Sequence, residues 1–180
     1  YQFNFDLNRY YLELIQKILT IKNNIYLISV NIRTLGLLDP YLRNDASINC
    51  NNYICYLRYE NSSKIIGLAN ISIIIHNNYI KELYICLNTF ILTGAFLSSH
   101  ICGNNLYSSN FESFYIFLDH KQISLVFHPT VFSWDVIIKD YCLILADFQG
   151  DISIALLRLI LYGTTDKFQN LKYYILICVE

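Results

Sequence analysis

An uncharged stretch of twenty residues, Leu83–Cys102, constrains the fold more than any other feature of this sequence. It reaches the length of about 20 residues that a transmembrane helix requires. No belt of aromatic residues and no cluster of Lys and Arg flanks it. Lipid would accept its polar side chains only opposite protein partners; these are Asn88, Thr89, Thr93, Ser98, Ser99 and His100. We therefore expect a buried element, either one helix or two core strands broken near Gly94. A membrane helix at about 83–102 is the alternative.

Two amphipathic helices and a series of β-rich runs make up the expected fold. Apolar residues recur at helical spacing over roughly Asp6–Ile21. They do so again over Ile152–Tyr162, where Asp151 fits an N-cap and Gly163 a C-terminal cap. We expect strands at Ile25–Thr34, Tyr53–Glu60, Ile65–Ile75, Phe114–Leu118, Ile123–Phe127, Val131–Ile138, Tyr141–Phe148 and Leu171–Val179. The sequence thus predicts one α+β domain over residues 1–180, mainly antiparallel β-sheet with an N-terminal amphipathic helix and a second helix near the C-terminus.

Turn signals between these runs indicate where the chain reverses. Residues 41–52 are polar and are interpreted as a loop. Asn61–Ser63 separates two β-rich runs and predicts a hairpin, as does Asp119–Gln122 further along the chain. Pro129 is expected to end the strand before it, because proline cannot donate to a sheet ladder.

The cysteines are predicted to be mostly reduced and buried. Most lie inside apolar runs, where a free thiol behaves as a small hydrophobic group. If a disulfide forms, we expect it between Cys50 and Cys55. The full set is Cys50, Cys55, Cys86, Cys102, Cys142 and Cys178.

The histidines do not form a pattern that is typical of a metal site. The closest pair of potential ligands is His100 with Cys102. His120 and His128 are expected at the two ends of one strand, on the same face. At about 3.3 Å per residue they would lie roughly 26 Å apart, too far to share an ion. We predict no metal ligand and no cofactor.

No catalytic motif stands out in the chain. A Gly-x-Ser-x-Gly elbow, a phosphate-binding loop and a His-Glu-x-x-His motif are all absent from the sequence. We interpret Asp147 and Asp151 as capping and solvated residues beside a helix N-terminus. Asp119 and His120 are expected to face water in a turn, and Trp134 to lie in the core or an interface. No catalytic or cofactor-binding residue is assigned.

Composition favours a protein that associates with others. The chain is 54% hydrophobic and only 15% charged, so some apolar surface should be covered by partners or lipid. Its net charge of −1 makes nucleic acid an improbable main ligand. The leading interpretation is therefore a non-enzymatic subunit or interaction module of a larger protein assembly. The first alternative is a small enzyme whose site is assembled from residues distant in sequence. The second is a membrane-associated subunit.

The residue usage also indicates an AT-rich genome. The chain contains 28 Ile but 5 Val, although the two pack almost equally well in a core. Codons for Ile, Asn and Tyr are rich in A and T, and an organellar or viral assembly would fit this bias. The chain has no Met, so we expect that Tyr1 is not the translation start and that a leader or further chain precedes it. The sequence assigns no compartment.

Overall fold

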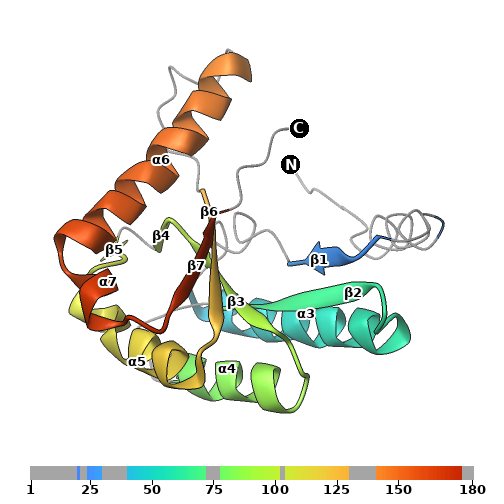
Figure 1. Cartoon of the computed structure of the whole chain (residues 1–180). Helices are drawn as coiled ribbons and strands as arrows, with labels where there is room; N and C mark the ends of the chain where they lie inside the picture. Colours follow the sequence, from blue (N-terminus) through green and yellow to red (C-terminus); the bar gives the residue numbers. More distant parts are fainter. Residues whose placement is uncertain are drawn as a thin grey trace.

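The structure is a computed structural model that describes residues 20, 24–29, 40–71, 78–101, 104–129 and 141–175. In chain order, the strands and helices alternate over most of this length (Figure 1). The strands are β1 (Tyr26–Ile28), β2 (Ile65–Asn70), β3 (Gly94–Ser98), β4 (His100–Ile101), β5 (Asn104–Asn105), β6 (Ser124–His128) and β7 (Lys172–Ile175). The helices are α3 (Pro40–Glu60), α4 (Asn78–Asn88), the 3-10 helix η1 (Ser109–Phe111), α5 (Glu112–Lys121), α6 (Tyr141–Leu161) and α7 (Thr164–Lys167).

The main sheet is parallel throughout, which corrects the predicted fold class. Its five strands lie in the order β1-β2-β3-β6-β7, and each neighbouring pair runs parallel. Only the short β4–β5 pair in the connection after β3 is antiparallel among the described residues. Because parallel neighbours need a crossover connection, a helix separates each strand of the main sheet from the next. The domain is therefore an α/β fold with a parallel sheet, not an α+β fold with an antiparallel sheet.

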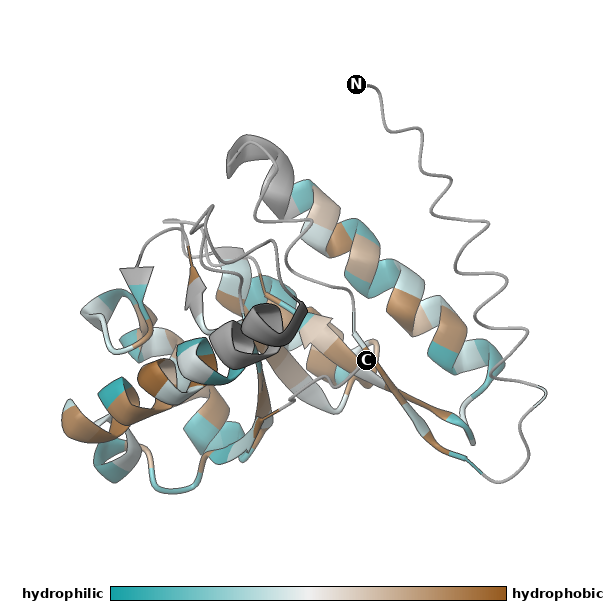
Figure 2. Cartoon of the chain, turned by 90° about the horizontal axis from the view of Figure 1, so that it is seen from above, coloured by the Kyte–Doolittle hydropathy of each residue, from teal (hydrophilic) through white to brown (hydrophobic). Residues whose placement is uncertain are grey.

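Helix α3 replaces the predicted loop at residues 41–52 and the predicted strand at Tyr53–Glu60. Its buried positions include Ser47, Asn51, Ile54 and Leu57, which recur every three or four residues. Two of these four are polar, so the apolar pattern alone does not show the helical period. The hydropathy colouring shows the same mixture of hydrophilic and hydrophobic residues along α3 (Figure 2).

Helices also replace two predicted strands in the C-terminal half. Phe114–Leu118 lies in α5, where Phe114, Tyr115 and Leu118 are buried on one helical face. Tyr141–Phe148 forms the first part of α6. The Asp119–Gln122 segment is therefore no hairpin turn, but the end of α5, closed by Gln122 in the left-handed conformation at φ 53°.

Several local predictions are confirmed. Strand β2 lies inside the predicted Ile65–Ile75 run, and β6 ends at His128, directly before Pro129. Gly163 follows α6 with φ 72° and donates its N–H to the Ile160 carbonyl, as expected of a helix C-terminal glycine. The final strand β7 lies within Leu171–Val179.

The uncharged stretch Leu83–Cys102 divides into two buried elements. It supplies the second part of α4 and then, from Gly94, strand β3. Within the described part of the chain, no helix is both long enough and apolar enough to cross a membrane. The predicted helix at Asp6–Ile21, apart from the helical Thr20, and the predicted strand at Val131–Ile138 lie outside the described residues.

The sheet has two differently packed faces. Helices α3, α4, α5 and α6 cover one face, and the main core lies between them and strand residues such as Ala69, Leu97 and Phe127. The opposite face carries a small cluster of Leu68, Phe96 and Val126 from the three central strands. We call this second surface the inner face, because it would line the interior if the sheet curved into a barrel.

Candidate functional site

Polar side chains gather where the central strands of the sheet end. Asn70 is the last residue of β2, Ser98 the last of β3 and His128 the last of β6. Side chains alternate between the two faces of a strand, so these three share the inner face with Leu68, Phe96 and Val126. The register supports this, because Asn70 pairs with Phe96, and Ser98 with His128. In barrels of parallel strands, ligands bind at this carboxyl edge.

His128 is the most reactive of these side chains, and its ring is held in place from two sides. Its Nδ1 lies 2.7 Å from the Pro129 carbonyl oxygen, which can only accept a hydrogen bond. The contact therefore places the proton of the neutral ring on Nδ1 and the lone pair on Nε2. The ring also packs against Phe96 with a centroid separation of 5.5 Å. Such a ring can transfer a proton or bind a cation through Nε2.

The end of β2 is fixed by a polar side chain from α3. The Asn51 side chain donates from Nδ2 to the Asn70 carbonyl at 3.0 Å and accepts from the Asn70 N–H at 2.8 Å. Ser47 Oγ donates to the same carbonyl at 2.9 Å. The β1 ladder reaches only as far as Gly67, so the Asn51 amide takes the place of a neighbouring strand beside Asn70. It thereby fixes the backbone that carries the Asn70 side chain.

Helix α4 joins this polar cluster. Asn51 Nδ2 also donates to Glu82 Oε1 at 3.1 Å, and Cys86 Sγ donates to the same carboxylate oxygen at 3.4 Å. Burial raises the pKa of the Cys86 thiol well above its usual range, and the Glu82 carboxylate raises it further. Cys86 is therefore a protonated donor here, not a reactive thiolate.

A second buried contact lies at the same edge of the sheet, between β3 and α6. The Ser99 hydroxyl donates to Asp151 Oδ2, and the Ser99 N–H donates to the His128 carbonyl at 3.0 Å. Asp151 is buried in the middle of α6, so the prediction that it caps a helix N-terminus is wrong. Its carboxylate instead joins the helix layer to the segment that follows β3.

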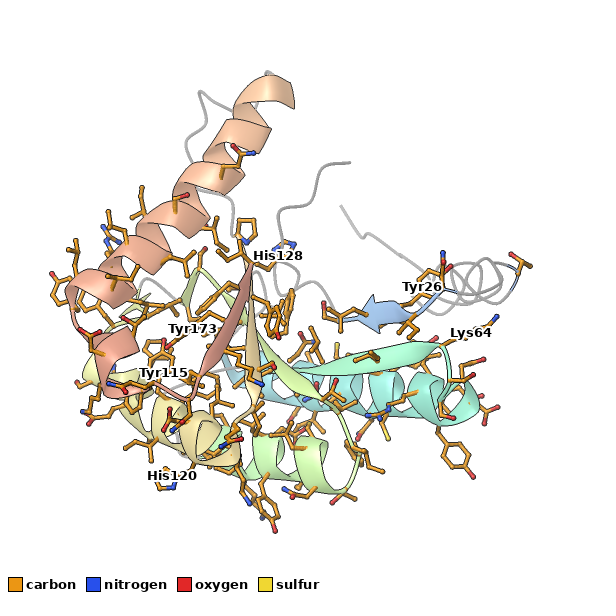
Figure 3. The ribbon with its side chains drawn as sticks, viewed as in Figure 1. Tyr26, Lys64, Tyr115, His120, His128 and Tyr173 are labelled. Atoms are coloured by element: carbon orange, nitrogen blue, oxygen red, sulfur yellow. The ribbon has the colours of Figure 1, made fainter. Side chains whose placement is uncertain are left out.

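Other residues singled out in the sequence lie away from this edge. His120 is exposed on α5 at the lower edge of the molecule, far from His128 at the upper end of β6 (Figure 3). Asp119 accepts hydrogen bonds from the Asn170 N–H at 2.8 Å and from Asn170 Nδ2 at 3.2 Å, which holds the turn before β7. His120 and His128 therefore lie on a helix and a strand, not on one strand as predicted.

The described cysteines are reduced, as predicted, and the pair considered for a disulfide is not joined. Cys50 and Cys55 lie on the same helix and both carry free thiols, and burial raises the pKa of the Cys50 thiol. Cys86 is buried as expected. Residues Cys102, Trp134 and Cys178 lie outside the described residues, as do the side chains of His100, Cys142 and Asp147.

Sequence reasoning missed Asn70, Ser98 and His128 as a group. One signal was present in each case, since a polar residue ends a short run of mostly apolar residues, most clearly in Ser124–His128. Their convergence depends on strand direction, because only parallel strands bring all their carboxyl ends to one edge. In the described ranges, no group of three His, Cys, Asp or Glu side chains could hold a metal ion.

The comparisons with known proteins agree on the fold. No known protein family and no curated protein matches the chain. The 5-carboxyvanillate decarboxylase of Sphingomonas paucimobilis has a TM-score of 0.76 at 18% identity, over 84% of this chain and 47% of that one. The 2,6-dihydroxybenzoate decarboxylase of Rhizobium has a TM-score of 0.77 at 14% identity, over 92% and 58%. A Staphylococcus aureus protein described as an amidohydrolase has a TM-score of 0.78 at 15% identity, over 93% and 59%.

The matched proteins are longer, and two further ones contain a metal. The chain spans about half the length of the solved structures it matches. A 5-carboxyvanillate decarboxylase of Novosphingobium aromaticivorans and a dihydroxybenzoic acid decarboxylase of Polaromonas each have bound manganese.

These matches correct the functional prediction made from composition. The similar structures are decarboxylases and amidohydrolases, so the interpretation as a non-enzymatic structural subunit is contradicted. The alternative of an enzyme whose site is assembled from residues distant in sequence agrees better with the fold. The chain has the parallel, barrel-type α/β fold of the decarboxylases and amidohydrolases that it resembles.

Proposed function

We propose that this chain is an enzyme, or part of one, and that it decarboxylates an aromatic acid at the carboxyl edge of its sheet. The observation that carries the proposal is the position of His128. Its imidazole ends a central parallel strand, is oriented by Pro129 and shares the inner face with Asn70 and Ser98. The reaction class is that of the structurally similar decarboxylases, which are named for aromatic acids.

In such a reaction, the bond between the carboxylate carbon and the ring carbon breaks, and carbon dioxide leaves. The electron pair of that bond stays on the ring carbon, which then takes up a proton. We assign the delivery of this proton to His128, whose protonated imidazole can donate from Nε2 while Nδ1 remains on the Pro129 carbonyl. The neutral ring then regains its proton from water. Asn70 and Ser98 supply hydrogen-bonding side chains on the same inner face.

A metal does not enter this assignment. Two of the similar decarboxylases contain manganese, an ion that favours carboxylate, carbonyl and water oxygens as ligands. Among the residues that the structure describes, no group of three His, Cys, Asp or Glu side chains forms around the His128 ring. The described residues therefore do not fit a complete metal centre, and no step is derived from one.

The test measures release of carbon dioxide from 2,6-dihydroxybenzoate and from 5-carboxyvanillate, with and without added manganese. His128→Asn removes the proton-transferring nitrogen and should lower the rate at least about 100-fold. His120→Asn is the matched control, because it makes the same change at an exposed helix position and should leave the rate unchanged. Folding of each variant is verified by far-ultraviolet circular dichroism.

Two outcomes would contradict the proposal. The first is a folded wild-type chain that releases no carbon dioxide from either acid, whether or not manganese is added. The second is a His128→Asn variant as active as the wild type, which would place the chemistry at another residue.

A further inference from the structure

The last three turns of α6 are apolar on both sides of the helix. Ile152, Ala155 and Leu159 are buried against the sheet. The opposite side carries four apolar residues that are about half exposed or more, and we call them the α6 outer face: Ile154, Leu157, Ile160 and Leu161. Leu161 is 72% exposed and Leu157 54%. A helix that is hydrophobic all round is normally covered on all sides, so this face is typical of a contact surface.

The α6 outer face is almost free of charge. Arg158 is the only charged residue between Ile152 and Leu161, and its Nη1 donates to Asn105 Oδ1 at 2.8 Å in the same chain. Beside it, the Tyr162 ring stacks on Tyr107 with a centroid separation of 3.8 Å and an angle of 2° between the ring planes. The border of the face is therefore ordered, and nothing in it requires a partner of opposite charge.

The place of α6 in the fold separates this face from the edges where the sheet could grow. Helix α6 belongs to the outer helix layer, whereas additional strands would pair with the edge strands β1 or β7 (Figure 1). In a barrel of parallel strands, the far side of such a helix is the outside of the protein. Further strands joined to the sheet would therefore leave the α6 outer face uncovered.

The area of the face suits an interface between two copies of the chain. Taking about 150 Å² for an Ile or Leu side chain, the lower end of the range for the larger aromatic ones, the four exposed fractions amount to on the order of 350 Å². One side of a stable interface buries about 800 Å², of which roughly 60% is apolar. The face thus supplies most of the apolar area that one partner needs. We propose that a second copy of this chain covers the α6 outer face and that the protein is a symmetric dimer in solution.

The test is sedimentation equilibrium of the full chain between roughly 1 and 100 µM. The expected wild-type species has twice the 21.1 kDa mass of one chain. Leu157→Glu places a charge at the centre of the face and should raise the dissociation constant at least about 30-fold. The matched control is Ile116→Glu, because Ile116 is an exposed isoleucine on α5 and its replacement should not change the mass.

A second control excludes pairing through the sheet. Ile175→Glu changes an exposed residue on the edge strand β7 and should leave the dimer intact. Circular dichroism establishes that each variant is folded. A wild-type monomer at all concentrations would overturn the proposal. So would a dimer that persists in Leu157→Glu or one that is lost in Ile175→Glu.

Discussion

The two halves of the helix layer share one apolar core but differ in the contacts that supplement it. In the α3–β2–α4 half, a buried polar cluster adds to the apolar packing. Asn51 joins the backbone of Asn70 to the carboxylate of Glu82, and Ser47 and Cys86 add one hydrogen bond each. Each of these bonds requires a particular distance and direction.

The α5–β6–β7 half depends on aromatic packing instead. The rings of Phe114 and Tyr115 lie 5.6 Å apart, and Tyr115 lies 5.5 Å from Phe168. Phe127 and Tyr173 stack at 5.9 Å with an angle of 12°. These contacts bury a large area with few directional requirements.

The difference indicates a division of roles. Aromatic packing stabilises the fold through the area it buries, whereas the polar cluster fixes the position of one strand end. That strand end carries Asn70, at the edge where the candidate site lies. The following substitutions test this division from the largest expected effect to the smallest.

Phe114→Ala should give the largest loss of stability. Phe114 is fully buried and also contacts the ring of Tyr79 at 6.3 Å, so truncation leaves a cavity between α4 and α5. We expect the free energy of unfolding to fall by about 4 kcal/mol, measured by urea denaturation. Ile116→Ala on the exposed side of α5 is the control and should cost less than about 1 kcal/mol. Equal losses in the two variants would show that the aromatic half does not carry the stabilisation assigned to it.

Asn51→Leu should cost somewhat less, about 3 kcal/mol. It removes the amide that serves both backbone groups of Asn70 and leaves Glu82 without that donor. Asn52→Leu changes the exposed neighbour on the same helix and should have little effect. Hydrogen exchange at the Asn70 amide should be faster in Asn51→Leu than in the wild type. It should not be faster in Phe114→Ala, when the variants are compared under conditions that give them equal overall stability. Unchanged exchange at Asn70 would contradict the role of Asn51 in fixing the strand end.

Sequence alone predicted the elements that depend on local chemistry. The β2 run, the end of β6 before Pro129 and the glycine cap at Gly163 are set by residue type and by near neighbours. The elements wrongly predicted as strands were helices rich in Ile, Tyr and Phe, such as Phe114–Leu118. Ile, Tyr and Phe favour strands in general, so their abundance gave these helices an apparent β propensity.

The candidate site could not be predicted because it depends on strand direction. In an antiparallel sheet, the ends of β2, β3 and β6 would alternate between two edges. Once the strands are parallel, Asn70, Ser98 and His128 come to one edge. Strand direction follows from the helices between the strands, and the polar residues Ser47 and Asn51 hid the first of these helices.

Two tyrosines whose hydroxyl groups are buried distinguish the contribution of hydroxyl hydrogen bonds from that of ring packing within the aromatic half. The Tyr115 hydroxyl donates to the Leu106 carbonyl at 3.0 Å, so Tyr115→Phe should lower the free energy of unfolding by about 1 kcal/mol. The Tyr173 hydroxyl is buried and finds no hydrogen-bond partner among the described residues. Tyr173→Phe should therefore raise stability slightly, by less than about 1 kcal/mol. Denaturation of both variants measures whether the free energy of unfolding falls or rises in each. A clear fall in Tyr173→Phe would reveal a hydrogen-bond partner for that hydroxyl.

The pH dependence of stability above pH 10 should show the smallest effect. Burial and, to a smaller extent, the negative charge of Asp119 together raise the pKa of Tyr173 to about 12, whereas an unfolded tyrosine titrates near 10. Between pH 10 and 12 the unfolded chain therefore loses this proton first, and stability falls as the pH rises. Because the side chain is partly exposed, we expect the Tyr173 contribution to be below about 1 kcal/mol. Tyr173→Phe should flatten the decline, whereas Tyr174→Phe, which changes an exposed neighbour, should not. Equal slopes in the two variants would show that Tyr173 ionises as readily in the folded chain as in the unfolded one.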